Sequence, residues 1–158
     1  MNARDALGRE PRGQQRVRRI AGSESQESFA GSDFTYEDIG GREFDDYTYT
    51  LVGETADAYT IESKARDASA RFPRVVSTIR KDTFVVVAAD IYNKRNELQK
   101  QFEATRVEKS GKYWTVMAMT MKDLSQKTRT ALTVTKAEYD LGLGDDVFTR
   151  RELEKVIR

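Results

Sequence analysis

The chain has 158 residues, of which 38% are hydrophobic and 34% are charged, with a formal net charge of +1. This length predicts one domain with a hydrophobic core, and the near-neutral charge gives no general attraction to nucleic acid or to anionic lipid. Histidine and cysteine are absent, which excludes Ser-His-Asp chemistry, thiol nucleophiles and the commonest zinc sites. In addition, no stretch approaches the roughly 18 apolar residues of a membrane-spanning helix.

The first 20 residues form a basic segment with six arginines against two acidic residues. Gly8 and Pro11 argue against a continuous helix there, and the first residues lack the apolar core of a signal peptide. A basic arm could contact phosphate or anionic lipid, but we favour a solvated terminus. We therefore divide the chain into an arm and linker over residues 1–30 and a single β domain over residues 31–158.

An acidic segment follows, with eight carboxylates and one arginine between Glu24 and Asp46. Their spacing differs from that of an EF-hand calcium loop, so we interpret them as a solvated acidic surface. Within this segment the pattern predicts a short helical turn, in which Asp33 is the N-cap and Gly40 ends the helix.

Alternating apolar residues then predict a series of strands. Tyr47, Tyr49 and Leu51 alternate with threonines, and a second strand has Tyr59 and Ile61 on one face. A third strand is predicted over residues 74–80. Each of these strands is polar on one face, which is typical of an antiparallel sheet with one face in water.

The densest apolar run covers residues 81–92 and predicts the central strand of the sheet. Because side chains alternate in a strand, Val85, Val87, Ala89 and Ile91 are expected to share one face. These side chains are small or β-branched, so they favour strand structure and leave space above that face.

Three further strands are predicted after the central one. The first runs from Leu98 to Val107, and the second, from Tyr113 to Met121, places Met117, Met119 and Met121 on one face with Thr115. The third runs from Thr130 to Tyr139, with Leu132 and Val134 pointing inward. A short amphipathic helix is expected over residues 150–157. The total is a mainly β chain with seven or eight antiparallel strands joined by sequential hairpins.

The apolar faces of these strands allow two interpretations. They either form a filled core or wall a cavity that holds an apolar ligand, and alternation alone favours the filled core. An enzyme would depend on acidic pairs such as Asp45 and Asp46 or Asp145 and Asp146 as acid and base. Adjacent carboxylates are far more often turn residues, so we predict that the chain is not an enzyme.

Several stretches, taken in order from about residue 14 to the C-terminus, resemble the outer-membrane lipoprotein-sorting protein family, which is related to the periplasmic lipoprotein carrier LolA. These stretches are Arg18-Arg19-Ile20, Gly31-Ser32-Asp33-Phe34-Thr35-Tyr36-Glu37-Asp38, Tyr59-Thr60-Ile61-Glu62-Ser63, Val75-Val76-Ser77, Lys81-Asp82-Thr83-Phe84, Tyr113-Trp114-Thr115, and Asp146-Val147-Phe148-Thr149-Arg150-Arg151-Glu152-Leu153-Glu154.

This resemblance implies an incomplete, curved antiparallel half barrel, LolA-like, whose concave apolar face shelters the acyl chains of lipoproteins or another hydrophobic ligand. It also implies a periplasmic location and contact with membrane-associated donor or acceptor proteins. No cofactor, metal or nucleic acid is expected. The residues predicted to wall the cavity are Tyr47, Tyr49, Leu51, Val85, Val87, Ala89, Ile91, Met117, Met119, Met121, Leu132 and Val134.

The sequence also departs from the family pattern. Family members usually have a signal peptide and a large N-terminal half, whereas this chain begins near the middle of the pattern. We therefore expect an exposed edge on the sheet. The alternative function is a non-enzymatic interaction module with a filled core, in which the open edge or the charged segments bind a partner protein or a membrane surface.

Overall fold

The computed structural model describes residues 22–149 and 151–152, and its main feature is a single sheet of seven strands. None of the helices in this part of the chain is long and apolar enough to cross a membrane. The strands are β1 (Tyr47–Glu54), β2 (Ala58–Ala65), β3 (Arg74–Arg80), β4 (Val86–Tyr92), β5 (Leu98–Ser110), β6 (Tyr113–Asp123) and β7 (Thr128–Thr133).

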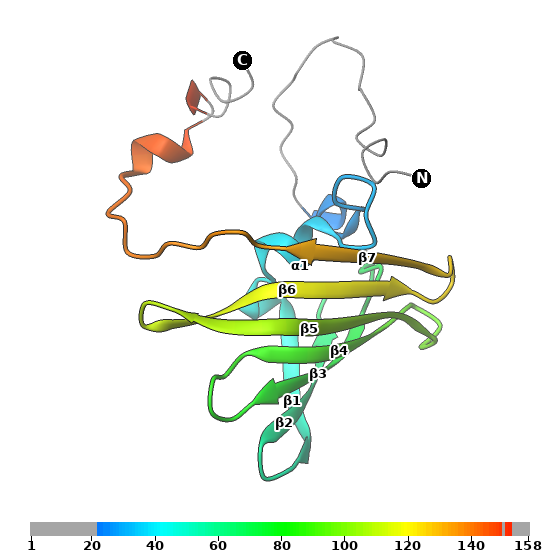
Figure 1. The fold of residues 1–158 in the computed structure, drawn as a ribbon. Coiled ribbons are helices and arrows are strands. Elements are labelled where there is room, and N and C mark those ends of the chain that lie inside the picture. Colours follow the sequence, from blue (N-terminus) through cyan, green and yellow to red (C-terminus); the bar gives the residue numbers. More distant parts are fainter. Residues whose placement is uncertain (1–21, 150, 153–158) are drawn as a thin grey trace, which may run out of the picture. The chain divides into compact units, whose positions relative to one another are not determined.

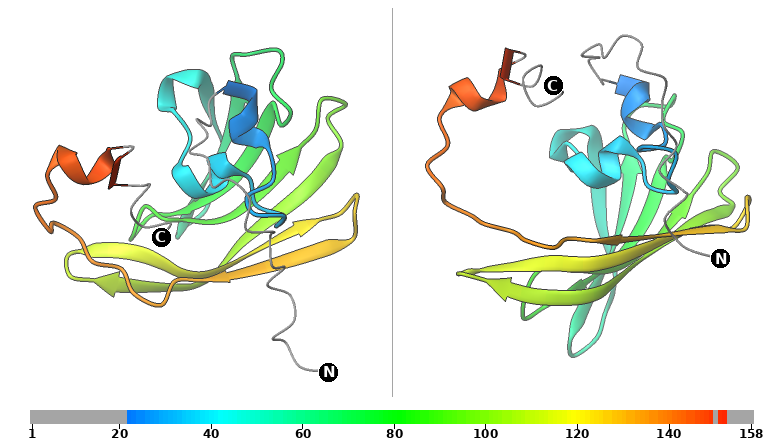
Figure 2. Two further views of the ribbon diagram at one scale, coloured as in Figure 1. Left: turned by 90° about the horizontal axis from the view of Figure 1, so that it is seen from above. Right: turned by 45° about the horizontal axis from the view of Figure 1, so that its top comes forward.

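The sheet is an antiparallel meander, in which each strand pairs with the next one along the chain (Figure 1). This confirms the mainly β prediction and places β4, the predicted central strand, in the middle of the sheet. The sheet curves but does not close into a barrel, because β1 and β7 remain its two outer strands within the described residues (Figure 2). An open sheet of this kind has a concave face that other parts of the chain can cover.

The segment before β1 covers the concave face (Figure 2). It consists of a 3-10 helix, η1 (Gly22–Gln26), the short helix α1 (Tyr36–Gly40) and a second 3-10 helix, η2 (Phe44–Asp46). The N-cap of α1 is Thr35, whose hydroxyl accepts from the Asp38 amide while the Asp38 carboxylate accepts from the Thr35 amide. The prediction that Asp33 caps this helix is therefore wrong.

Asp33 instead attaches the covering segment to the sheet. Its carboxylate accepts hydrogen bonds from the hydroxyls of Thr128 and Thr130, at 2.5 and 2.7 Å, both on β7. Its carbonyl oxygen accepts from the ammonium of Lys100 on β5 at 2.5 Å. Such charge-assisted bonds are stronger than neutral ones, so this residue fixes the segment over the far strands of the sheet.

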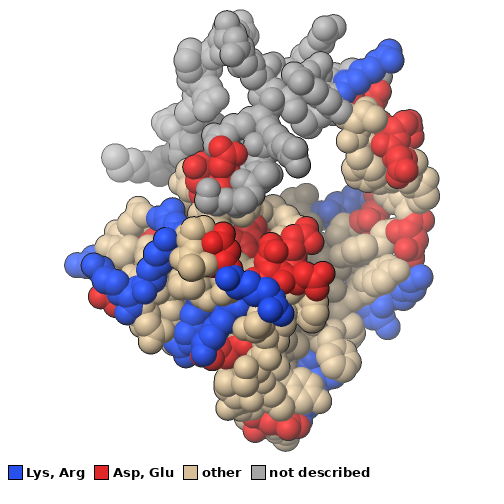
Figure 3. Space-filling model, turned by 180° about the vertical axis from the view of Figure 1, so that it is seen from behind, with Lys and Arg blue, Asp and Glu red and all other residues tan. Residues whose placement is uncertain are grey.

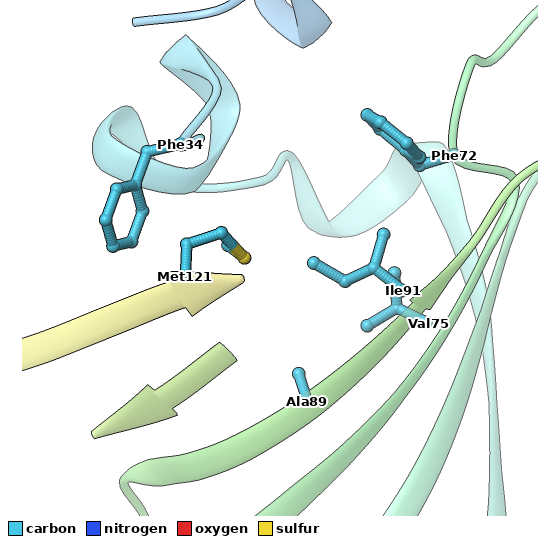
Figure 4. Packing of buried hydrophobic residues seen from close by; sticks show 6 residues of the cluster. All are labelled: Phe34, Phe72, Val75, Ala89, Ile91 and Met121. Atoms are coloured by element: carbon cyan, nitrogen blue, oxygen red, sulfur yellow. The ribbon is translucent and has the colours of Figure 1, made fainter. Parts of the chain in front are cut away.

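The core lies between the covering segment and the concave face. Phe34 from that segment is only 1% exposed and lies in one cluster with Met121 of β6, which is equally buried (Figure 4). Full burial of side chains of this size stabilises the fold by about 1.5–3 kcal/mol each. The remaining members of the cluster are Phe72, Val75, Ala89 and Ile91.

The last part of the chain differs from its prediction. β7 ends at Thr133, whereas a strand to Tyr139 was expected, and residues 140–144 have no regular structure. A 3-10 helix, η3, covers Asp145–Phe148. The predicted helix over residues 150–157 and the basic arm over residues 1–20 lie outside the described residues, apart from Arg151 and Glu152.

Candidate functional site

An open cavity of about 370 Å³ lies on the concave face between α1 and the strands β1 to β6. Its volume is within the range of small-ligand sites in proteins. Most of its wall is apolar, with two serines in the floor and charged side chains only at the α1 side. The lining residues are Glu37, Asp38, Gly41, Arg42, Tyr49, Ile61, Ser63, Val75, Ser77, Ile79, Val86, Ala89, Ile91, Phe102 and Met121.

Strand register explains why these residues share one face. Directly paired residues in an antiparallel sheet point to the same side. One row of pairs crosses the sheet from Leu51 to Thr130 and another from Tyr49 to Thr128. The first row contains Leu51, Ile61, Ser77, Ala89, Phe102, Met121 and Thr130, and the second contains Tyr49, Ser63, Val75, Ile91, Lys100, Asp123 and Thr128.

The wall contributed by β4 differs from its prediction by a β-bulge. Pairing passes from Thr78 with Ala88 to Ile79 with Val86, so Val87 is an extra residue and the alternation shifts by one. Val86 therefore lines the cavity, whereas Val85 and Val87 do not. Val85 lies in the β3–β4 loop, after Phe84, whose φ of 54° turns the chain.

The methionine strip on β6 is also interrupted. Met121 lines the cavity and Met119 packs against the edge of the core cluster, as an unbroken alternation predicts. Met117 is an extra residue, because pairing passes from Arg106 with Ala118 to Val107 with Val116. The backbone carbonyl of Met117 still accepts a hydrogen bond from the Val134 amide, at 2.8 Å. Consequently, the predicted methionine wall is reduced to a single lining residue.

The remaining predicted wall residues are divided between the cavity, its margin and the core. Tyr49 lines the cavity and stacks on Phe44, with ring centroids 4.8 Å apart. Leu51 continues the same face but is 54% exposed. Leu132 packs against the core cluster beside Met119, while Val134 follows the end of β7. Of the twelve predicted residues, the structure brings Tyr49, Ala89, Ile91 and Met121 together in the cavity wall.

Several lining residues were missed although the sequence contains a signal for some of them. Val75, Ser77 and Ile79 alternate on β3, in the same way as the residues chosen on β1. Ile61 is predicted on the apolar face of its strand and Phe102 lies within the strand predicted from Leu98 to Val107, but neither is among the predicted wall residues. Their positions follow from pairing between strands, which no single strand reveals.

A group of charged and phenolic side chains borders the cavity beside α1. The Arg42 guanidinium lies 3.6 Å from Glu37 and 3.6 Å from Asp38, and 5.6 Å from the centre of the Tyr47 ring. The Tyr47 hydroxyl donates to the Glu37 carboxylate. Burial and this hydrogen bond raise the pKa of Tyr47 well above its usual value. Tyr47 therefore stays protonated and helps to hold α1 next to β1.

The acidic pairs considered from the sequence lie apart from the apolar cavity. Asp45 and Asp46 are exposed, as are Asp145 and Asp146, and none of the four lines the apolar cavity. Within residues 22–149 and 151–152, no group of three or more acidic side chains is arranged to hold a metal ion. The cavity offers an apolar wall with a charged border, which suits an amphiphilic or apolar ligand.

Comparison with known proteins identifies both a family and a fold. A protein-family model described as "Uncharacterized protein"-like matches residues 13–155. No curated protein matches the chain. Among solved structures, a DUF1329 family protein from Desulfovibrio piger is similar, with 33% identity and a TM-score of 0.76. The similarity covers 86% of this chain and 59% of that one.

Two more distant structures share the fold. One is an outer membrane lipoprotein-sorting protein domain from Vibrio parahaemolyticus, with a TM-score of 0.80, 22% identity, and coverage of 88% of this chain and 61% of that one. The other is a LolA superfamily protein from Nitrosomonas europaea, with a TM-score of 0.62, 19% identity, and coverage of 90% and 65%. The chain thus spans about three fifths of the length of the structures it resembles.

Proposed function

Because the chain belongs to the "Uncharacterized protein"-like family and has the fold of lipoprotein-sorting and LolA superfamily structures, we propose that it is a carrier of acyl chains. In this proposal the concave cavity shelters the chains of a lipoprotein or another hydrophobic ligand from water. The carrier acts in the periplasm during outer-membrane lipoprotein sorting. It exchanges its cargo with membrane-associated donor and acceptor proteins.

The observation that carries the proposal is an apolar cavity that remains open beside a filled core. Phe34 packs onto Met121, but the covering segment leaves the surface around Ile61 and Ile79 accessible from the cavity. Each methylene transferred from water to such a surface contributes about 0.8 kcal/mol. Four to six buried methylenes therefore provide about 3–5 kcal/mol, which permits binding that is still reversible.

The composition of the wall is consistent with a carrier of varied hydrocarbon chains. Ala89 leaves room above β4, and the Met121 thioether adapts its shape to irregular contacts. Ser63 and Ser77 are the polar floor residues, and the Ser63 hydroxyl already donates to the Val75 carbonyl at 3.3 Å. A bound acyl chain would therefore cover the Ser63 hydroxyl without leaving it unpaired.

The charged border defines the orientation in which an amphiphilic ligand would bind. Arg42, Glu37 and Asp38 lie on the α1 side of the cavity, where the polar end of an amphiphile would meet water. The acyl chain would then extend toward Phe102 and Met121. A carrier with this arrangement needs no catalytic group.

The proposal is tested by titrating delipidated protein with a fluorescent fatty acid and with a triacylated peptide. We expect saturable binding of at least one of them and competition by unlabelled acyl chains. A matched pair of variants localises the site, because Ser77 lines the cavity and its neighbour Thr78 lies on the opposite face of β3. Absence of saturable binding by folded protein would exclude the carrier function.

The interaction module remains the second candidate because of the edge formed by β1. Strand β1 has no partner on its outer side within the described residues, and Leu51 and Val52 are 54% and 52% exposed. An edge strand whose single charged residue is Glu54, at its end, can pair with a strand from another chain. This candidate predicts concentration-dependent oligomers in light scattering and no fatty-acid binding, whereas a monomer that binds fatty acid excludes it.

A further inference from the structure

Three hairpin loops at one end of the sheet form a basic surface. In a meander every second turn lies at the same end, which brings together the loops 66–73, 93–97 and 124–127. They carry two exposed acidic residues, Asp67 and Glu97. Against these stand five exposed cationic residues, which are Arg66, Arg71, Lys94, Arg95 and Lys127. In Figure 3 lysine and arginine side chains gather at the left, the side of these loops.

The two carboxylates of this surface reduce its positive charge but do not cancel it, because five cationic and two acidic residues leave 5 − 2 = +3. The Asp67 carboxylate accepts from the amide and hydroxyl of Ser69 at 2.7 and 2.8 Å. Glu97 accepts from the Asn93 amide group and the Arg95 guanidinium, both at 2.9 Å. Hydrogen bonds from these partners hold the pKa of both carboxyl groups below their usual values.

The opposite end of the sheet lacks this excess of positive charge. Its three loops cover residues 55–57, 81–85 and 111–112, and they contain two cationic and two acidic residues. The near-neutral net charge of the whole chain therefore conceals an asymmetry between the two ends of the sheet. A charged ligand or membrane that approaches the basic end therefore meets a positive local potential, although the net charge of the chain is close to zero.

The basic end also has a hollow of a size that accepts a small anionic group. It has a volume of about 380 Å³ and lies between the first two loops, where arginine, lysine and amide side chains provide several donors. Guanidinium and ammonium groups are the usual partners of phosphate oxygens. The lining residues are Ser69, Arg71, Asn93, Lys94, Arg95 and Gln99.

An exposed leucine at the same end indicates which kind of partner the basic surface suits. Leu124 in the third loop is 42% exposed, and its amide donates to the Gln99 carbonyl at 2.7 Å, which fixes the loop beside β5. A large apolar side chain among cations is typical of protein surfaces that meet the boundary between headgroups and acyl chains. Nucleic acid offers no comparable partner for Leu124.

We propose that these three loops form a docking surface for an anionic lipid membrane. Phosphate headgroups contact Arg71, Lys94 and the neighbouring cations, and Leu124 enters the headgroup region. The surface is separate from the apolar cavity and shares no lining residue with it. Docking and acyl binding can therefore be measured independently of each other.

The test is sedimentation of the full chain with phosphatidylglycerol–phosphatidylcholine vesicles and with pure phosphatidylcholine vesicles. We expect binding to the anionic vesicles only, weakening as salt rises. Each basic residue near an anionic surface contributes about fivefold in affinity, so the double variant Lys94→Gln/Lys127→Gln should bind roughly 25-fold more weakly. Leu124→Ser should also weaken binding to the anionic vesicles. Because the contribution of this side chain is apolar, the factor by which binding weakens should be the same at low and at high salt.

The matched control is Arg106→Gln/Lys109→Gln, which removes two exposed charges from β5 outside these loops. It should bind like the unmodified chain, and all variants should retain fatty-acid binding in solution. Equal losses in the control and the loop variant would overturn the proposal, as would binding to duplex DNA as tight as binding to vesicles. A chain that docks but binds no fatty acid would refute the carrier function and leave the docking surface in place.

Discussion

Replacing Ser77 with phenylalanine tests the cavity most simply, because this side chain is small, partly exposed and placed in the middle of the cavity floor. Register places Ser77 between Ile61 on β2 and Ala89 on β4, in the row that continues to Phe102. A phenylalanine there would extend into the space that an acyl chain is proposed to occupy. Phenylalanine also suits a strand, so β3 should be retained.

The size of the effect follows from the length of chain displaced. In a cavity of about 370 Å³ a phenyl ring excludes about three methylenes from the wall. At about 0.8 kcal/mol for each methylene, the loss is about 2.4 kcal/mol, or roughly 60-fold in Kd. The expected Kd for a fluorescent fatty acid thus increases by between one and two orders of magnitude.

The assay is fluorescence titration of delipidated protein, with circular dichroism and urea unfolding to establish that the variant is folded. Thr78→Phe is the control, since it adds the same ring to the opposite face of the same strand and should leave Kd within about twofold. Unchanged affinity in folded Ser77→Phe protein would refute the assignment of the cavity as the ligand site. Equal losses in both variants would also contradict it.

The remaining predictions concern stability. Met121→Ala should lower the free energy of unfolding by about 2–5 kcal/mol in urea titration, because the side chain is 1% exposed, and a loss below about 1 kcal/mol would contradict its place in the core. Thr35→Ala should cost about 1 kcal/mol by removing one half of the capping box, whereas Asp38→Ala removes the other half and should cost a similar amount. Burial raises the pKa of Asp123, but hydrogen bonds from Ser125 and Gln126 outweigh it and hold this pKa below its usual value. The folded pKa is thus below the unfolded one, so this stabilisation is present above the unfolded value near 3.9 and is lost as pH falls through the folded pKa. Asp123→Asn should flatten the stability profile in that acidic range, and an unaltered slope would show that the carboxylate is not responsible.

The meander was predictable because each of its strands carries its own signal. Alternation in Tyr47–Leu51 and in Tyr113–Met121 identifies strands without knowledge of their neighbours, and short polar turns between them require antiparallel hairpins. β3 was predicted with its observed bounds. The resemblance to the lipoprotein-sorting family added curvature, which is confirmed by the open sheet and by the solved structures of similar fold.

The cavity wall was less predictable because it depends on bulges and on pairing. A single extra residue at Val87 moves Val86 to the concave face, and another at Met117 removes this methionine from the strip. Alternation continues through both positions in the sequence, so no local pattern reveals the shift. The role of Asp33 was missed for a similar reason, since its partners Thr128 and Thr130 lie almost one hundred residues away.

The central claim is that an acyl chain lies on the concave face of the sheet, and the most direct measurement is nuclear magnetic resonance of methyl-labelled protein with a bound fatty acid. Contacts between ligand methylenes and the methyl groups of Ile61, Ile79 and Val86 are predicted, since all three line the cavity and none is fully buried. Val76, on the opposite face of β3, serves as the internal control and should show none. Contacts to Val76 in place of the concave-face methyls, or a complex without contacts to any of the three, would contradict the account.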